Sequence, residues 1–349
     1  MTTYINSIQH ITVTIASGSS TGTATISSVD TSKTFLIFGG VTTTDGGSTS
    51  GGIGYVTLTN ATTVTATRTG TAAITVTITV TVVEATSSLV SSVQYGTVSI
   101  SATTTNTATI SSVDTSRSAV FYLGFTGERI GTVVLTNSTT VTGTYGNNGT
   151  GVLSFVVVEF QSAAITSIQQ KNQAFVSSSS TDTLTITSVD TSRTMLAYGG
   201  THFSSSFTDL YAAEITSSTA ISLYRGGTGT STRTIALTAI QFASGVVSAI
   251  DSGVINLQNV TSNTDTVSLD KDVTAISFTG WRSAETGFAF NIHYQKVALT
   301  NDTTVTGTVN TSTNHAMGAG WQTVTFGTGS SGFQSAWARN SNQIIGVMQ

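Results

Sequence analysis

A seven-residue motif recurs along this chain and sets its organisation. It is SSVDTSK at residues 27–33, SSVDTSR at 111–117 and TSVDTSR at 187–193, with VSLDKDV at 267–273 as a weaker fourth copy. A second marker follows each copy in the same order: LTNATTVTATR at 58–68, LTNSTTVTGTY at 135–145, ITSSTAISLYR at 215–225 and LTNDTTVTGTV at 299–309. Two markers in one order, four times over, indicate internal duplication.

The markers divide the chain into four predicted modules, at residues 1–86, 87–162, 163–244 and 245–349. A repeat of roughly 80 residues is longer than the units of about 20–50 residues that build solenoids and propellers. We therefore expect each module to be a small domain. The last module diverges most from the shared pattern and is our candidate recognition module.

Within a module, apolar and polar residues alternate with the two-residue period of a β-strand. Ile74, Val76 and Ile78 face one way and the threonines between them face the other, which predicts a half-buried strand. The run at 35–38 is apolar on both faces, so we expect it at the centre of a covered sheet. The strands expected in module 1 lie near 10–16, 22–28, 34–38, 54–59, 63–68 and 72–84.

Short strands separated by turns rich in Gly, Asn and Ser are typical of an antiparallel sandwich or small barrel. No stretch keeps a 3.6-residue period over three turns, so almost no helix is expected. The predicted fold is all-β, with four tandem antiparallel β-sandwich modules of the jelly-roll or lectin-like type.

The composition excludes several classes of protein. The chain has 73 Thr and 48 Ser, only 8% charged residues and a net charge of −4, so it lacks the basic surface that nucleic-acid binding requires. Cysteine is absent, which excludes disulfides and thiolate chemistry. The sequence contains no stretch of about 20 mostly apolar residues, so we expect no membrane insertion. With so few charges to protect edge strands, we expect oligomerisation or assembly to cover those edges.

The repeated aspartates are the residues that most invite a catalytic interpretation, and we assign them a structural one. An aspartate at the start of a turn accepts hydrogen bonds from backbone N–H groups about two residues on. A cation three residues later, such as Arg117, can pair with it at the surface. The four structural-turn residues are Asp30, Asp114, Asp190 and Asp270.

Motifs for hydrolysis, phosphate binding or calcium binding are missing from the sequence. We predict a protein that is not an enzyme, with no catalytic residue, no cofactor and no metal.

Module 4 holds all three tryptophans and two of the four histidines. Exposed aromatic rings beside polar side chains suit sugar recognition, since a ring covers the apolar face of a sugar. The alternative is that these rings fill a larger core or a subunit interface. The candidate ligand-binding residues are Trp281, His293, Tyr294, His315, Trp321 and Trp337.

The two markers resemble the Thr/Ser-rich β-repeats of structural proteins in tailed bacteriophages, and the module size more weakly resembles H-type lectin sandwiches. The resemblance covers modules 1 to 3 and the LTNDTTVTGTV part of module 4. It implies a non-enzymatic virion protein, a tail-fibre or tail-tip component with possible attachment to a host-surface glycan. Its implied partners are other virion proteins and copies of itself, most often as a trimer.

A head decoration or head-fibre protein is the first alternative, and a secreted bacterial adhesin is the second. An ice-binding protein is a third interpretation, although that function requires a flat, regular solenoid with a much shorter repeat. The first residues, MTTYINSIQHITVTIAS, have neither a basic region nor a continuous apolar region, so we expect no export signal. The expected location is the outer surface of a virion assembled in the host cytoplasm, with modules 1 to 3 forming a stalk or docking surface.

Overall fold

The computed structural model describes residues 2–46, 51–127, 130–175, 179–203, 210–226, 232–283, 293–313 and 316–327. Across these residues the regular structure consists of twenty-two strands and two three-residue 3-10 helices, η1 (Ser162–Ala164) and η2 (Thr191–Arg193). The pairings between named strands are all antiparallel. The prediction of an all-β antiparallel fold is confirmed.

Modules 1, 3 and 4 each contain six strands in the same order. Module 1 has β1 (Ile5–Ile15), β2 (Thr21–Thr25), β3 (Thr34–Thr43), β4 (Tyr55–Asn60), β5 (Thr63–Thr67) and β6 (Val76–Ala85). Module 3 has β11 (Ile165–Phe175), β12 (Thr181–Thr185), β13 (Thr194–Phe203), β14 (Leu210–Ser217), β15 (Ala220–Arg225) and β16 (Arg233–Phe242). Module 4 has β17 (Val247–Asn256), β18 (Ser262–Thr266), β19 (Thr274–Ser283), β20 (Gln295–Asn301), β21 (Thr304–Val309) and β22 (Met317–Phe326).

Module 2 follows the same path with four longer strands: β7 (Val90–Thr109), β8 (Ser118–Phe125), β9 (Gly131–Asn137) and β10 (Thr140–Phe160). β10 pairs first with β9 and then with β8, and it pairs with β7 along nearly its whole length. β7 therefore takes the place of β1 and β2, and β10 takes the place of β5 and β6.

Each module is a sandwich of two three-stranded sheets. In module 1, β6 pairs with β1 and β3 to form the inner sheet, while β5 pairs with β2 and β4 to form the outer sheet. Side chains that alternate along both sheets, such as Val13, Ile15, Val64 and Val76, are fully buried between them. The two-residue period of the sequence thus produces the sandwich core.

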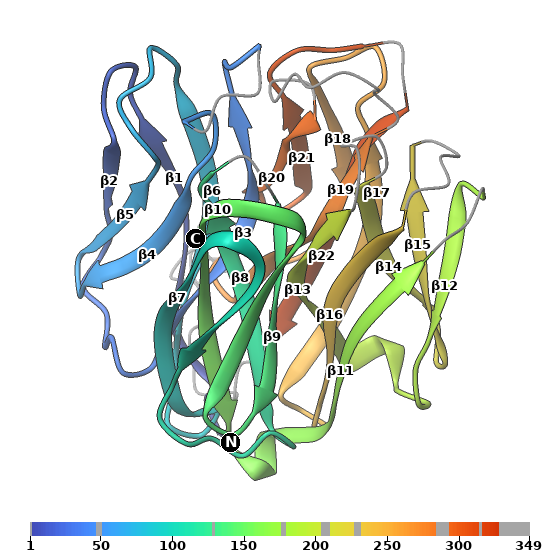
Figure 1. Ribbon diagram of the computed structural model, residues 1–349. Coiled ribbons are helices and arrows are strands. Elements are labelled where there is room, and N and C mark those ends of the chain that lie inside the picture. Colours follow the sequence, from blue (N-terminus) through green and yellow to red (C-terminus); the bar gives the residue numbers. More distant parts are fainter. Residues whose placement is uncertain are drawn as a thin grey trace, which may run out of the picture.

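The modules are joined to one another in a closed ring (Figure 1). Backbone pairing links β4 to β8, β9 to β13 and β14 to β19, and it links β3 of module 1 to β20 of module 4. We call each of these contacts a seam and name it by its two modules. Because the 1–4 seam joins the first module to the last, the modules do not lie in an open row.

The strands that face the centre of the ring are β3, β8, β13 and β19, each in contact with the next. Four aromatic rings from these strands form a closed square, with centroids 5.9 Å apart for Phe38 and Tyr122, 5.9 Å for Tyr122 and Tyr198, 5.6 Å for Tyr198 and Phe278, and 6.0 Å for Phe278 and Phe38. All four contacts are T-shaped, the arrangement that the ring quadrupole favours. The square is the shared hydrophobic core of the ring.

A glycine with positive φ lies at each seam, two residues after the aromatic residue that the same strand contributes to the square. The four are Gly40 (φ 98°), Gly124 (φ 103°), Gly200 (φ 100°) and Gly280 (φ 129°). A Cβ on any of them would overlap backbone of the neighbouring module. A Cβ on Gly124, for example, would lie 2.6 Å from the carbonyl oxygen of Gly54. Glycine is required here both for its conformation and for the close approach of two backbones.

The sequence predicts a solvated threonine face along β6, and this is wrong for the second half of the strand. Thr79 and Thr81 are only 5% and 1% exposed, because that face lies against module 4. The Thr79 hydroxyl donates to the carbonyl of Val297 at 2.9 Å, and the Thr81 hydroxyl donates to the carbonyl of Ile276 at 3.2 Å. The threonines serve the seam, where their hydroxyls satisfy backbone groups across the interface.

The repeated aspartates make the turn hydrogen bonds that the sequence predicts. Each Oδ1 accepts from the backbone N–H two residues on: Ser32 at 2.8 Å, Ser116 at 2.9 Å, Ser192 at 3.0 Å and Asp272 at 3.0 Å. Hydrogen bonds from Ser192 and Arg193 lower the pKa of the Asp190 carboxyl to about 2. Lys33 departs from the pattern, since its Nζ donates to the carbonyls of Val90 and Ser91 in module 2.

We predict that Gly200→Ala weakens the 2–3 seam. The matched control is Gly18→Ala, because Gly18 also has positive φ (78°) but has nothing within 4 Å of a Cβ. The control should cost about 1 kcal/mol of unfolding free energy, the strain of the backbone alone. Gly200→Ala should cost at least about 2 kcal/mol more, since its Cβ overlaps the carbonyl of Gly131. Equal losses in chemical denaturation would show that the close approach at the seam does not matter.

Candidate functional site

Trp281, a candidate ligand-binding residue, lies at the centre of the ring. It is fully buried, and its ring centroid is 4.8 Å from that of Phe278, 5.9 Å from Tyr198 and 6.2 Å from Phe38. Its indole N–H donates to the carbonyl of Gln295 at 2.9 Å. Trp281 therefore packs against the aromatic square and has no surface to offer a ligand.

Two more candidates lie in the same interior. Tyr294 is fully buried, with its ring 5.2 Å from Trp281 and 5.8 Å from Phe125 of module 2. His293 is also fully buried, and its Nδ1 lies 3.1 Å from the Ser283 hydroxyl. The structure brings these three residues together as core, which agrees with the alternative given above and not with a solvent-facing recognition site.

Trp321 lies apart from that group, inside module 4. It is 3% exposed, and its indole N–H donates to a carboxylate oxygen of Asp265 at 2.8 Å. Gly253 on the paired strand leaves room for the indole, since a Cβ there would lie 3.3 Å from the ring. The remaining candidates, His315 and Trp337, lie outside the described residues.

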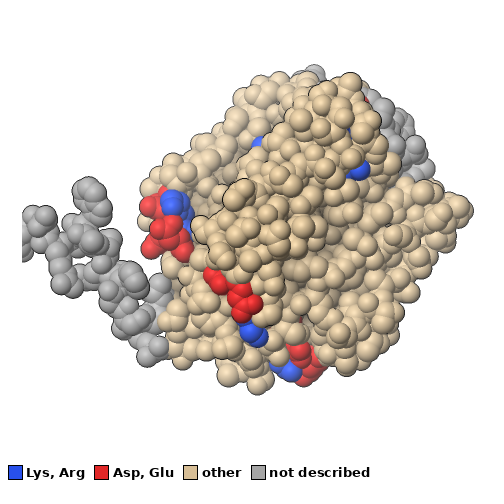
Figure 2. Space-filling view, turned by 90° about the vertical axis from the view of Figure 1, so that its left-hand side faces the viewer, with Lys and Arg blue, Asp and Glu red and all other residues tan. Residues whose placement is uncertain are grey.

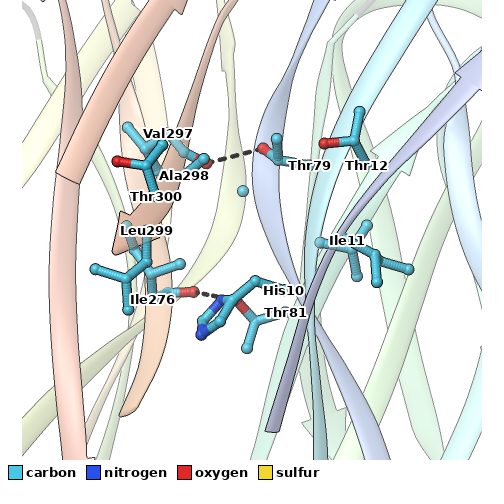
Figure 3. A pocket seen from close by; sticks show the side chains of 12 residues that line it. His10, Ile11, Thr12, Thr79, Thr81, Ile276, Val297, Ala298, Leu299 and Thr300 are labelled. Carbon is cyan, nitrogen blue, oxygen red and sulfur yellow. Dashed lines mark hydrogen bonds between the residues drawn. The ribbon is translucent and has the colours of Figure 1, made fainter. Parts of the chain in front are cut away.

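A solvent-facing hollow occurs at the 1–4 seam (Figure 3). It has a volume of about 210 Å³ and lies between the inner sheet of module 1 and strand β20 of module 4. His10, Thr12, Thr79 and Thr81 come from the module 1 wall. The opposite wall consists of residues 297–300 of β20 with Ile276 behind them. We call this hollow the seam pocket.

His10 is the titratable group of the seam pocket. Its Nε2 lies 3.3 Å from the carbonyl of Lys271 and its Nδ1 lies 3.3 Å from the Thr81 hydroxyl, so it bridges the two modules. Burial lowers the pKa of His10, while the contact with the Lys271 carbonyl opposes that shift. The neutral imidazole is thus the form that this position favours.

A second histidine occupies a related place at the 2–3 seam. His202 of β13 lies with its Nδ1 3.1 Å from the hydroxyl of Thr132 on β9. Burial lowers the pKa of His202 to about 4. Two of the ring's seams therefore hold an imidazole that is neutral at physiological pH.

Charge is sparse on this side of the molecule. Figure 2 views the ring from the side of module 1 and shows most of the charged side chains in a band that runs from the left edge to the bottom, with a few Lys or Arg atoms visible above it. No charged side chain lines the seam pocket among the described residues. The pocket can therefore offer hydroxyls, an imidazole, backbone carbonyls and apolar surface to a ligand.

The part of the chain that the structure describes contains no group of three or more His, Asp or Glu side chains able to hold a metal ion. None of its helices is long and apolar enough to cross a membrane.

Comparison with protein-family models, curated proteins and solved structures finds no match for this chain.

Sequence reasoning missed the seam pocket because it needs two modules that are far apart in the chain. One signal was present in the aligned openings SIQHITVTI, SVQYGTVSI and SIQQKNQAF, which place His10, Tyr95 and Gln170 at one position. A position that varies among otherwise similar repeats marks a place where the modules differ in their contacts.

We predict that acid weakens the fold through His10 and His202. Both have a pKa below that of the unfolded chain, near 6.5, so the unfolded state takes up protons that the folded state does not. Stability should be constant above pH 6.5 and fall between pH 6.5 and about 4. Through His202 alone, the free energy of unfolding at pH 5 should be lower than at neutral pH by on the order of 2 kcal/mol.

The matched variants are His10→Gln and His202→Thr. Each introduces the residue found at the equivalent position of another module, Gln170 for His10 and Thr42 for His202. Chemical denaturation at pH 7.5 and pH 5 measures the loss. The double variant should lose clearly less stability on acidification than the parent. An identical loss of unfolding free energy in both proteins would show that the two imidazoles do not cause it.

Proposed function

We propose that this protein is a non-enzymatic structural component of the outer surface of a tailed-bacteriophage virion. The resemblance of its repeats to those of phage structural proteins supports this class. The observation that carries the proposal is the closed ring, because duplicated sandwiches joined at four seams make a rigid block from a single chain. Such a block suits an architectural role in a larger assembly.

The shape of the ring bears on its place in a virion. A ring whose first and last modules touch suits a tail-tip element or a head decoration protein better than the shaft of a long fibre. The burial of Trp281, Tyr294 and Trp321 favours the head decoration alternative in turn, since these rings support the core and are not available to attach a host.

The outer edges of the ring support contacts with other copies or other virion proteins. Strands β2, β12 and β18 end their sheets without a further partner in the described chain. Thr21, Thr23 and Thr25 of β2 are exposed, and no charged residue guards that strand. An unguarded edge strand is a ready site for pairing with another chain. This agrees with the proposed homo-oligomer, for which the resemblance favours a trimer.

The experiment is immunogold labelling of purified phage particles with antibodies raised against the intact chain. We expect label at fixed positions on the particle, on the tail tip or over the head, and none on particles from a deletion of the gene. Label restricted to the bacterial envelope would overturn the proposal and favour the secreted adhesin.

A further inference from the structure

The seam geometry occurs four times in this ring, and the residues that face one another differ at each seam. The two-wall geometry repeats because an inner sheet always meets the neighbouring module's outer sheet at the glycine bend. Strand pairing aligns one position on the inner-sheet wall, occupied by His10, Tyr95, Gln170 or Ser252. It also aligns one position on the opposite wall, occupied by Ala298, Thr57, Val134 or Glu214.

At the 1–2 and 3–4 seams the aligned inner-wall side chain bonds to the neighbouring module, as His10 does at the 1–4 seam. At the 1–2 seam, the Tyr95 hydroxyl crosses from module 2 and donates to the carbonyl of Thr34 at 3.2 Å. At the 3–4 seam, the Ser252 hydroxyl donates to a carboxylate oxygen of Glu214 at 3.4 Å. Gln322 adds hydrogen bonds to the Leu196 N–H at 2.7 Å and the Thr194 carbonyl at 3.1 Å.

At the 2–3 seam, the equivalent hollow shrinks to about 10 Å³, lined by Val134, Gln170 and Lys171 among others. Further along the same seam, a wide shallow groove lies between Thr136 and Ile168. The 1–4 seam instead keeps a solvent-facing hollow of about 210 Å³, with the small Ala298 where module 2 has Val134. Of the two aligned hollows, the one at the 1–4 seam is thus the larger, and the smaller side chain lies on its opposite wall.

The hydrogen-bonding groups of the seam pocket select the kind of ligand. The Thr79 and Thr81 hydroxyls already donate to backbone carbonyls, so their remaining capacity is to accept. Thr12 and Thr300 add exposed hydroxyls at the rim, and Leu299 and Ile276 add apolar surface. With no charged lining side chain among the described residues, the pocket offers no counter-charge to an ionic ligand.

From this we propose that the seam pocket binds one neutral sugar ring, a hexose or the terminal hexose of a glycan. A sugar hydroxyl both donates and accepts, which suits a lining rich in acceptors, and its C–H face suits the apolar surface. The volume is below the range of about 300–1,000 Å³ that is usual for larger ligands, so a single ring is the size that fits. This inference rests on the proposed role at the virion surface. It places ligand binding at the 1–4 seam and not at the buried aromatic residues of module 4.

The experiment uses the intact chain and saturation-transfer NMR with glucose, galactose, mannose and N-acetylglucosamine, each alone at millimolar concentration. We expect at least one of them to bind. Ala298→Val, which copies Val134, should weaken that binding at least tenfold by filling the pocket. The matched control, Thr57→Val, changes the equivalent position at the 1–2 seam and should leave binding unchanged.

Thermal unfolding of both variants keeps the result interpretable, since a folded Ala298→Val protein that retains full binding would overturn the proposal. Absence of binding by all four sugars would overturn it as well, as would equal binding of glucuronate, which carries a charge. Immunogold labelling of virions reports on the proposed structural role independently, so failure of sugar binding leaves that result intact.

Discussion

The structure depends on the close approach of two backbones at each seam. Four glycines with positive φ bend the inner strands at equivalent places and let the neighbouring module's strand lie where a Cβ would otherwise be. The approach also covers the edges of β3, β8, β13 and β19, which would be open in isolated modules, while β2, β12 and β18 remain at the ends of their sheets. The hydroxyls of Thr79 and Ser154 then satisfy carbonyls across the 1–4 and 1–2 seams.

Closure of the ring also accounts for the place of Trp281, one of the residues by which module 4 differs from the others. The four inner strands surround the centre of the ring, and each contributes one aromatic ring of similar size to the aromatic square. The space at the centre itself holds a single large side chain, which can come from only one module. Trp281 is that side chain, in contact with rings from modules 1 and 3 as well as its own. At this position, the difference between module 4 and the others thus serves packing in the core of the ring. The hydroxyls of Tyr122 and Tyr198, buried without a partner in the described residues, show that the square is selected for its rings, since Phe38 and Phe278 fill equivalent places.

Much of the local structure followed from the sequence, because strand periodicity and turn chemistry are local properties. The strands expected near 34–38 and 63–68 are β3 and β5, and the turn aspartates bond as expected. The ring did not follow, because a seam pairs strands of different modules and no local period encodes that pairing. The burial of Thr79 was missed for the same reason, since it contacts a module distant in sequence. A core position for Trp281 was one of the two alternatives, but its contacts with other modules could not be foreseen. The repeated FGG, YLG, YGG and FTG triplets were the available signal, since a glycine that returns after the same apolar strand marks a bend or a close approach.

Distances between modules test the closed ring most directly. Thr62, Thr139, Thr219 and Thr303 are exposed at equivalent turns, and the chain has no cysteine, so pairs of these threonines can be replaced by cysteine and spin-labelled. The ring predicts that the pair from modules 1 and 4 (residues 62 and 303) gives nearly the same distance as the pair from modules 1 and 2 (residues 62 and 139). The diagonal pair, residues 62 and 219, should be longer than both. A distance between residues 62 and 303 that exceeds the other two would mean that the modules lie in an open row, and it would contradict the closed ring.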